Sequence, residues 1–248
     1  MAGTLVQVLP GTLVQALSYT MLAVVAALVG GVIAVYRPPG SQMESNVQHF
    51  AAGVVIAAVA AELLPDVHEE APEIVVAGFA IGVATMLGIH RLSKLIEKRD
   101  IGGSFAGAAG LLITVGIDML IDGVLIGVTF LREAGTGVII AVALAIEVLF
   151  LGVAGVVALP SAVGTLRKLA VPAAFGVLLT TGVTVGVLAL EGVTGAPVAI
   201  ILAFGSAALL YLVTEELLVK AGKVPETPVS TTLFFVGFLS IFLLDMVH

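Results

Sequence analysis

Three acidic residues stand far inside segments that are otherwise apolar: Asp118, Asp122 and Glu147. Asp118 and Asp122 are four residues apart, which places both carboxylates on one face of a helix, roughly 6 Å apart. Glu147 reaches a matching depth if the next segment runs back antiparallel. Three carboxylates converging from two helices would supply the oxygen ligands that hard divalent cations prefer. The sequence therefore predicts a divalent-cation site, and protonated acids that hydrogen-bond between helices are the alternative.

The cost of burying these acids is the reason to expect a cation. An ionised side chain at the centre of a membrane helix costs about 2.5–3.5 kcal/mol, so three unpaired ones would cost on the order of 8–10 kcal/mol. No Lys, Arg or His occurs at the centre of an apolar segment to pair with them. The carboxyl groups must therefore be protonated or hold a cation.

Four further acids lie nearer to the ends of apolar segments: Glu62, Asp66, Glu215 and Glu216. We predict that Glu62 and Asp66 line an outer approach to the cation site. Glu215 and Glu216 would then line an inner exit. The alternative is that acids at helix ends simply reach the aqueous interface.

The segments that carry these residues must lie in a membrane. Hydrophobic residues make up 60% of the 248 residues and charged residues 11%, against about 25% charged residues in a typical soluble domain. This composition excludes a water-soluble enzyme and a disordered chain. The ten Lys and Arg form no basic stripe, so nucleic acid is not an expected partner. Continuous rather than alternating apolar runs exclude a β-barrel. We expect an all-α polytopic membrane protein with one transmembrane domain over residues 1–248.

Eight apolar runs reach the roughly 20 residues that a span requires. They lie near residues 12–36, 47–66, 74–91, 104–131, 137–159, 169–190, 196–219 and 229–248. Nine of the ten cations fall in connections on one side, with Arg132 the exception. The excess of positive charge in cytoplasmic loops then places both termini outside.

An internal repeat links the two ends of the chain. Residues 50–64 align with residues 204–218 at five identical positions: Phe50/Phe204, Val59/Val213, Glu62/Glu216, Leu63/Leu217 and Leu64/Leu218. The second span runs outward and the seventh inward, so the match predicts an inverted repeat. Its halves, about 12–91 and 169–248, flank a central helix pair at about 104–159. Secondary transporters commonly have inverted repeats, with the binding site near the midplane.

This pattern resembles the ZIP (Zrt/Irt-like) family of divalent metal transporters, in its prokaryotic branch. Residues 50–66, 205–217 and 237–245 look like the family's second, seventh and eighth spans. The family's fourth span usually reads His-Asn-x-x-Asp/Glu-Gly. Here the corresponding stretch reads Asp118-Met119-Leu120-Ile121-Asp122-Gly123, with an acid in place of the His and Met119 in place of the Asn.

In the fifth span, Glu147 would replace the family's first ligand. Val148, Leu149 and Leu151 are apolar where the family has an acid, a Pro and a further ligand. The resemblance therefore implies one carboxylate metal site rather than a two-metal centre. It also implies eight helices in a 3+2+3 arrangement, located in a prokaryotic plasma membrane. In this arrangement the central helices are expected to slide against a scaffold formed by the others.

We therefore expect membrane transport of a divalent cation (Zn, Mn, Fe, Co or Cd) along a path formed by spans 2, 4, 5 and 7. The expected partners are the ion and the lipid bilayer, with no resident cofactor and with a homodimer left open. One alternative is a ZIP-fold protein that has lost metal transport and carries another solute or acts as a binding or regulatory module. An intramembrane aspartyl protease is disfavoured because Asp118 and Asp122 share one helix, so no enzyme activity is expected.

Overall fold

The computed structural model describes residues 2–99 and 104–247, with side chains described for residues 11–96 and 108–247. This part of the chain contains helices and connecting turns and no strand. The elements are α1 (Ala2–Tyr36), α2 (Ser41–Ala58), η1 (Val59–Leu63), α3 (Leu64–His68), α4 (Pro72–Arg99), α5 (Ser104–Arg132), α6 (Ala134–Val157), α7 (Thr165–Leu190), α8 (Ala196–Tyr211), η2 (Leu212–Leu217), α9 (Leu218–Ala221) and α10 (Pro228–Asp245).

Eight helical segments among the described residues are long and apolar enough to cross a membrane, so the predicted all-α polytopic fold is confirmed. They are Gly11–Tyr36, Ser41–His68, Pro72–Ile96, Ala108–Arg132, Ala134–Val157, Thr165–Leu190, Ala196–Ala221 and Pro228–Asp245. Each of the eight predicted spans corresponds to one of them. One difference is α4, which continues to Arg99, eight residues beyond the predicted end of the third span. Arg91 and Lys94, predicted in a loop, therefore lie on a helix, because this stretch is rich in Leu, Lys, Glu and Arg.

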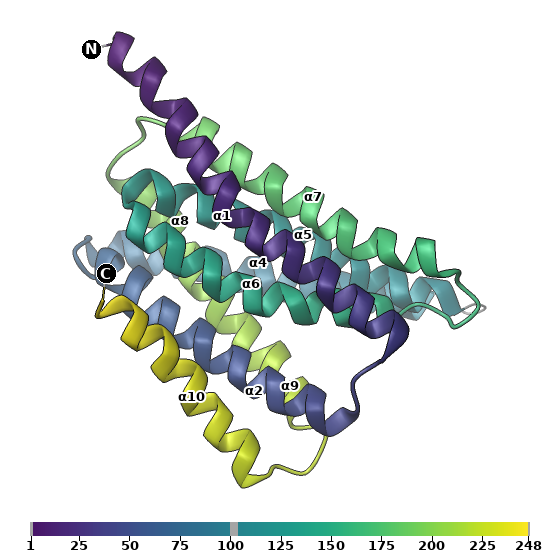
Figure 1. Ribbon diagram of the computed structural model, residues 1–248. Helices are drawn as coiled ribbons and strands as arrows, with labels where there is room; N and C mark the ends of the chain where they lie inside the picture. The colour runs from purple at the N-terminus through teal and green to yellow at the C-terminus, as the bar shows by residue number, and fades with distance from the viewer. Residues whose placement is uncertain (1, 100–103, 248) are drawn as a thin grey trace.

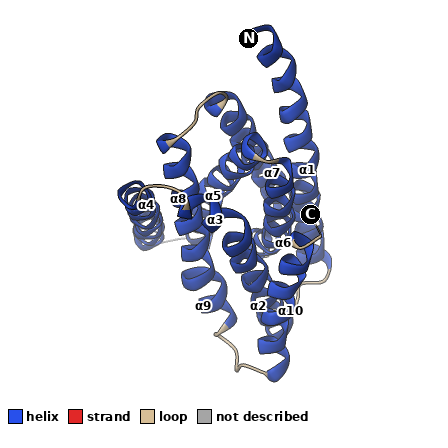
Figure 2. Cartoon of the chain, turned by 90° about the vertical axis from the view of Figure 1, so that its left-hand side faces the viewer, coloured by secondary structure: helices blue, strands red, loops and turns tan. Residues whose placement is uncertain are grey.

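The long helices form two groups (Figure 1). The central bundle consists of α1, α5, α6 and α7, which pack against one another. The flanking group consists of two helix pairs, α2 with α10 and α4 with α8, together with the short elements that continue α2 and α8. Figure 2 shows both pairs side by side, with α4 and α8 on one side of the molecule and α2 and α10 on the other.

Glycines let backbones touch inside each group. A methyl group added at Gly237 of α10 would overlap the carbonyl oxygen of Phe50 in α2. A methyl group at Gly82 of α4 would likewise meet the carbonyl oxygen of Phe204 in α8. Phe50 and Phe204 are matched by the internal repeat, so the α2–α10 contact reproduces the α8–α4 contact. Helices approach this closely in membranes where small residues line the contact.

The central bundle has the same kind of contacts. In α5 and α7, Gly123 faces the carbonyl oxygen of Leu179, and Gly182 faces that of Leu120. The glycine pairs Gly123/Gly127, Gly182/Gly186 and Gly78/Gly82, each spaced by four residues, all contact backbone of a neighbouring helix. Between the two groups, the described glycine contact is of another kind. Gly205 of α8 meets only the side chain of Leu125 in α5.

Two π-helices interrupt the second and seventh spans at matching positions. η1 contains Glu62 and η2 contains Glu216, which the repeat pairs with each other. Pro65 follows η1 and has no backbone N–H, so it cannot complete an α-helical bond there. In η2, the Thr214 hydroxyl donates to the carbonyl oxygens of Leu210 (2.9 Å) and Tyr211 (3.2 Å), which disturbs the regular ladder. The division into halves at 12–91 and 169–248 stays a prediction, which these matched features support.

Candidate metal centre

The structure brings the three predicted cation ligands together inside the central bundle. Asp118 and Asp122 come from α5 and Glu147 from α6. One carboxylate oxygen from each residue can be chosen so that the three atoms all lie within 4.8 Å of one another. Among the described residues, this acidic triad is the one group of acids, histidines and cysteines whose ligand atoms come so close.

The acidic triad is deeply buried and short of partners. Asp118 is 8% exposed, Asp122 2% and Glu147 0%. No protein group within the described part of the chain forms a hydrogen bond with Oδ2 of Asp122 or with either carboxylate oxygen of Glu147. Buried polar atoms are normally hydrogen-bonded. Three unpartnered oxygens at one place therefore indicate a site that either binds a cation or holds protons.

The spacing of the oxygens suits a small cation after a slight contraction. Metal–oxygen distances of about 2.0–2.2 Å keep two ligands of one ion within about 4.4 Å of each other. The 4.8 Å limit is close to that value, and a rotamer adjustment of a few tenths of an ångström would close the gap. The apolar side chains next to the ligands, Met119, Val148 and Leu151, are all buried and offer no hard oxygen.

One cation lies nearer to the acidic triad than the sequence suggested. Lys220, predicted in a connecting loop, is on α9 and belongs to the seventh span. Its ammonium pairs with Glu216 at 3.1 Å, and both charges are near enough to act on Asp118 and Glu147. Lys220 lies at the end of its span and pairs with Glu216, so it does not contradict the prediction that no Lys, Arg or His at a span centre pairs with the triad. The four-residue spacing of Glu216 and Lys220 was the signal that could have revealed this pair.

The other predicted path residues lie apart from the triad. Asp66 forms an ion pair with Arg132 at 3.1 Å, which joins α3 of the flanking group to α5 of the central bundle. Glu62 is buried, with Thr136 and Asp245 as polar neighbours. Glu215 is exposed.

Two cavities lie toward opposite ends of the helices, and we name them inner and outer after the predicted topology. The inner cavity has a volume of about 790 Å³ and lies among α1, α2, α6 and α9, and its lining includes Arg37, Gln48, Leu151 and Lys220. Leu151 is one helical turn beyond Glu147, so this cavity extends close to the triad. The outer cavity, about 380 Å³, is bordered by Asp66 of α3, Arg132 of α5 and Thr194 before α8.

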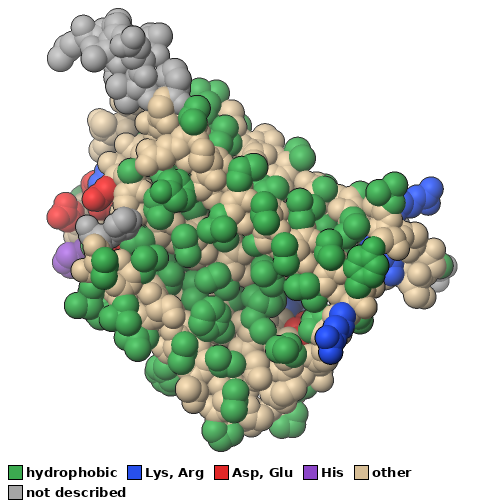
Figure 3. All heavy atoms as spheres, in the orientation of Figure 1, with side chains coloured by type: hydrophobic (Ala, Val, Ile, Leu, Met, Phe, Trp, Pro, Cys, Tyr) green, Lys and Arg blue, Asp and Glu red, His purple; other side chains and the backbone are tan. Residues whose placement is uncertain are grey.

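The two ends of the molecule carry different charges. Figure 3 shows most of the visible Lys and Arg side chains at the right-hand end, whereas acidic side chains and a histidine gather at the left-hand end. Arg132, the one cation that the sequence placed on the acidic side, is partly neutralised there by Asp66.

Comparison with known proteins adds no family assignment. No protein-family model matches the sequence, and no similar sequence is found among curated proteins.

Proposed function

We propose that this protein is a ZIP-like permease that transports a divalent metal cation across the membrane through the acidic triad. One observation carries the proposal above the others. Asp118, Asp122 and Glu147 converge at a buried place where three of their oxygens have no partner among the described groups. Intramembrane acids of this kind mark ion pathways in transporters.

The proposed path runs between the two cavities. An ion from the acidic end would pass Asp66 and Glu62, bind the acidic triad, and leave past Glu216 and Glu215 into the inner cavity. We propose that the end bearing most of the Lys and Arg faces the cytoplasm of a prokaryotic cell. The inner cavity is the larger of the two, as the proposal expects of a conformation open toward that side.

The arrangement of glycine contacts supports a sliding motion. Backbones touch within the central bundle and within the flanking group, which makes each group stiff. Side chains separate the two groups at Gly205 and Leu125. The central bundle, which holds the whole triad, would therefore move against the flanking group and carry the ion with it.

Ligands of carboxylate oxygen alone set the expected selectivity. They lack the nitrogen donors that favour Zn²⁺ over harder ions. We expect Mn²⁺, Fe²⁺ and Co²⁺ to compete within about tenfold of Zn²⁺, a difference of about 1.4 kcal/mol. Cd²⁺ belongs to the same test panel. Strong exclusivity for Zn²⁺ would mean that a ligand outside the acidic triad completes the site.

Uptake of this metal panel into proteoliposomes tests the function. The wild type should accumulate divalent ions, and Asp118→Asn should lose most of the uptake because it removes a ligand charge. Lys223→Met is the control, since Lys223 is an exposed charge two residues beyond the end of the seventh span. Equal uptake by the wild type, Asp118→Asn and protein-free liposomes would overturn the proposal.

A further inference from the structure

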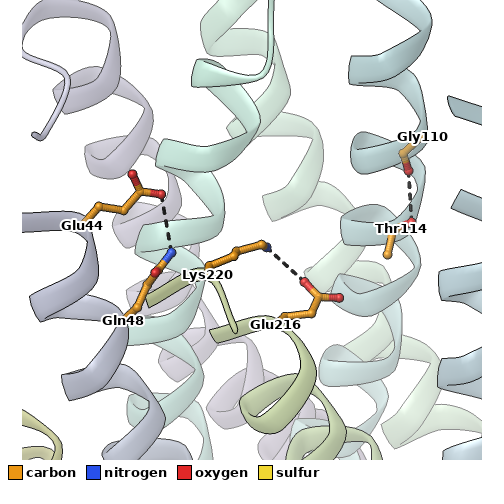
Figure 4. Close-up of polar contacts among 6 residues, drawn as sticks. All are labelled: Glu44, Gln48, Gly110, Thr114, Glu216 and Lys220. Carbon is orange, nitrogen blue, oxygen red and sulfur yellow. Dashed lines mark hydrogen bonds and ion pairs between the residues drawn. The ribbon is translucent and has the colours of Figure 1, made fainter. Parts of the chain in front are cut away.

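Lys220 borders the inner cavity near the acidic triad. Its side chain lines that cavity together with Leu151, which is one helical turn from Glu147, and its ammonium pairs with Glu216 at 3.1 Å. Figure 4 shows the ammonium pointing at Glu216, with Glu44 and Gln48 of α2 on the other side of the lysine in this view. On the proposed path, an ion that moves between the cavity and the triad passes this pair.

The pair is shielded from water more than a surface ion pair is. The Lys220 side chain is 28% exposed and that of Glu216 is 17% exposed. Exposed ion pairs contribute little, whereas pairs with lower exposure interact more strongly because solvent screens them less. Lys220 therefore remains at Glu216 unless another cation replaces it.

The internal repeat gives a reason to regard Lys220 as specialised. With Glu216 matched to Glu62, the same alignment matches Lys220 to Asp66. The outer half thus has an acid one turn after its π-helix glutamate, whereas the inner half has a base. In the outer half Asp66 is bound to Arg132, and the π-helix glutamate, Glu62, forms no ion pair among the described residues, whereas the π-helix glutamate of the inner half, Glu216, itself holds a cation that is bound to the chain.

Charge then decides which ion can take the place of the ammonium. A monovalent ion at Glu216 would replace one positive charge with another and gain no electrostatic energy. A divalent ion carries one more positive charge than the Lys220 ammonium. This extra charge would lie close to the negative charges of Asp118, Glu147 and Glu216. In a partly buried place, one extra unit charge outweighs the differences between ions of equal charge.

We propose that Lys220 determines the charge selectivity of the inner passage. Its ammonium group is a tethered monovalent cation that excludes free monovalent ions from the acidic triad and is displaced by divalent ions. The part of this inference that concerns divalent ions rests on the proposed function. The part that concerns monovalent ions depends only on the access of small cations to the triad, so the selectivity role of Lys220 and the proposed function can be tested separately.

The first experiment uses no metal. The chain contains no cysteine, so Asp118→Cys provides a single thiol at the triad. Its modification rate is measured with a small thiol reagent that carries one positive charge and with a neutral reagent of similar size. Lys220→Met should raise the cationic-to-neutral rate ratio by about tenfold, since removing a charge from a narrow passage changes local cation concentration on that scale. Lys220→Arg, which keeps the charge, and Lys223→Met, which removes an exposed one, should leave the ratio unchanged.

An unchanged ratio in Lys220→Met would overturn the proposal. So would an equal increase for both reagents, because the lysine would then act by filling space and not by its charge. The Arg variant keeps the test decisive if the Met variant folds poorly, since its ratio must remain at the wild-type value.

The second experiment measures Mn²⁺ affinity in buffers whose monovalent cation is either potassium or choline. Potassium should weaken Mn²⁺ binding several-fold in Lys220→Met and leave the wild type unaffected. Absence of Mn²⁺ binding by the wild type would defeat the proposed function, and the thiol experiment would still decide the role of Lys220. Normal Mn²⁺ binding with no effect of potassium on Lys220→Met would defeat the selectivity proposal alone.

Discussion

Glu147 is the residue at which the requirements of stability and of the proposed function differ most. It has no exposed surface, and neither of its carboxylate oxygens has a hydrogen-bond partner among the described groups. A buried polar group without a partner costs free energy that a leucine or methionine of similar size would not cost. The proposed cation site would account for its presence, whereas the stability of the bundle alone would favour an apolar residue.

The ligand role of the triad predicts a graded effect of removing its charges. Asp122→Asn should weaken Mn²⁺ binding by at least about tenfold, because one anionic ligand in a low-dielectric place is lost. Asp66→Asn is the control, since Asp66 pairs with Arg132 at the outer end and touches only the approach. We expect it to change affinity less than threefold. Titration calorimetry in detergent measures both, and equal effects of the two substitutions would contradict the assignment.

Protons and metal ions compete for the same oxygens, which predicts a pH dependence. Three adjacent carboxylates in an apolar place cannot all stay ionised without a cation, so the metal-free triad holds one or more protons. Metal binding must release them, and affinity then falls as pH falls, by about tenfold per pH unit for each proton released. Proton release during Mn²⁺ titration in two buffers of different ionisation enthalpy measures the number. Affinity that is constant between pH 6 and pH 7.5 would refute this prediction.

At the scale of the elements, apolar length was enough to find the spans. All eight predicted runs became membrane-length helices because a segment of about 20 apolar residues has few other stable forms in lipid. The π-helices were not predicted, since they arise from single residues, Pro65 and Thr214, acting on an otherwise continuous pattern. Lys220 was missed for a related reason. Hydropathy placed the end of the seventh span before it, whereas the helix continues to Ala221 and carries the ammonium back toward Glu216.

The glycine contacts predict which helix positions tolerate a methyl group. Gly237→Ala should lower the stability of the folded protein by about 1–3 kcal/mol, because the new methyl group would overlap the Phe50 carbonyl and force α2 and α10 apart. Gly88→Ala, in α4, is the control because nothing lies within 4 Å of its added methyl group. There the better helix propensity of alanine should leave stability equal or slightly higher. Thermal unfolding in detergent compares them, and similar losses for both would contradict the packing argument.

At the scale of the whole molecule, the sliding motion predicts where a cross-link blocks transport. Paired cysteines at Leu125 and Gly205 would join α5 to α8 across the two groups, at positions whose side chains meet. Oxidation of this pair should stop metal uptake, and a reductant should restore it. Cysteines at Gly116 and Leu178, which meet within the central bundle, are the control and should have little effect when oxidised. Transport that continues with the first pair cross-linked would exclude sliding.

The orientation in the membrane is tested by single introduced cysteines. Glu69 lies at the acidic end and Leu95 near the end of α4 at the basic end, and both are exposed. A thiol reagent that cannot cross the membrane should label Glu69→Cys in intact cells and label Leu95→Cys only after permeabilisation. The reverse pattern would invert the proposed topology.

The inner and outer cavities are unequal in size. Three elements around the inner cavity, α1, α2 and α9, correspond under the predicted repeat to α7, α8 and α3 around the outer one, and each cavity also borders one helix of the central pair, α6 or α5. If each half took up the other's arrangement, the wide and narrow cavities would change places, and the same chain would be open to the opposite side. The backbone packing of such a state would be nearly that of the present one. The balance between the two states would therefore depend on positions at which the halves differ in charge, such as Asp66 on one side and Lys220 on the other.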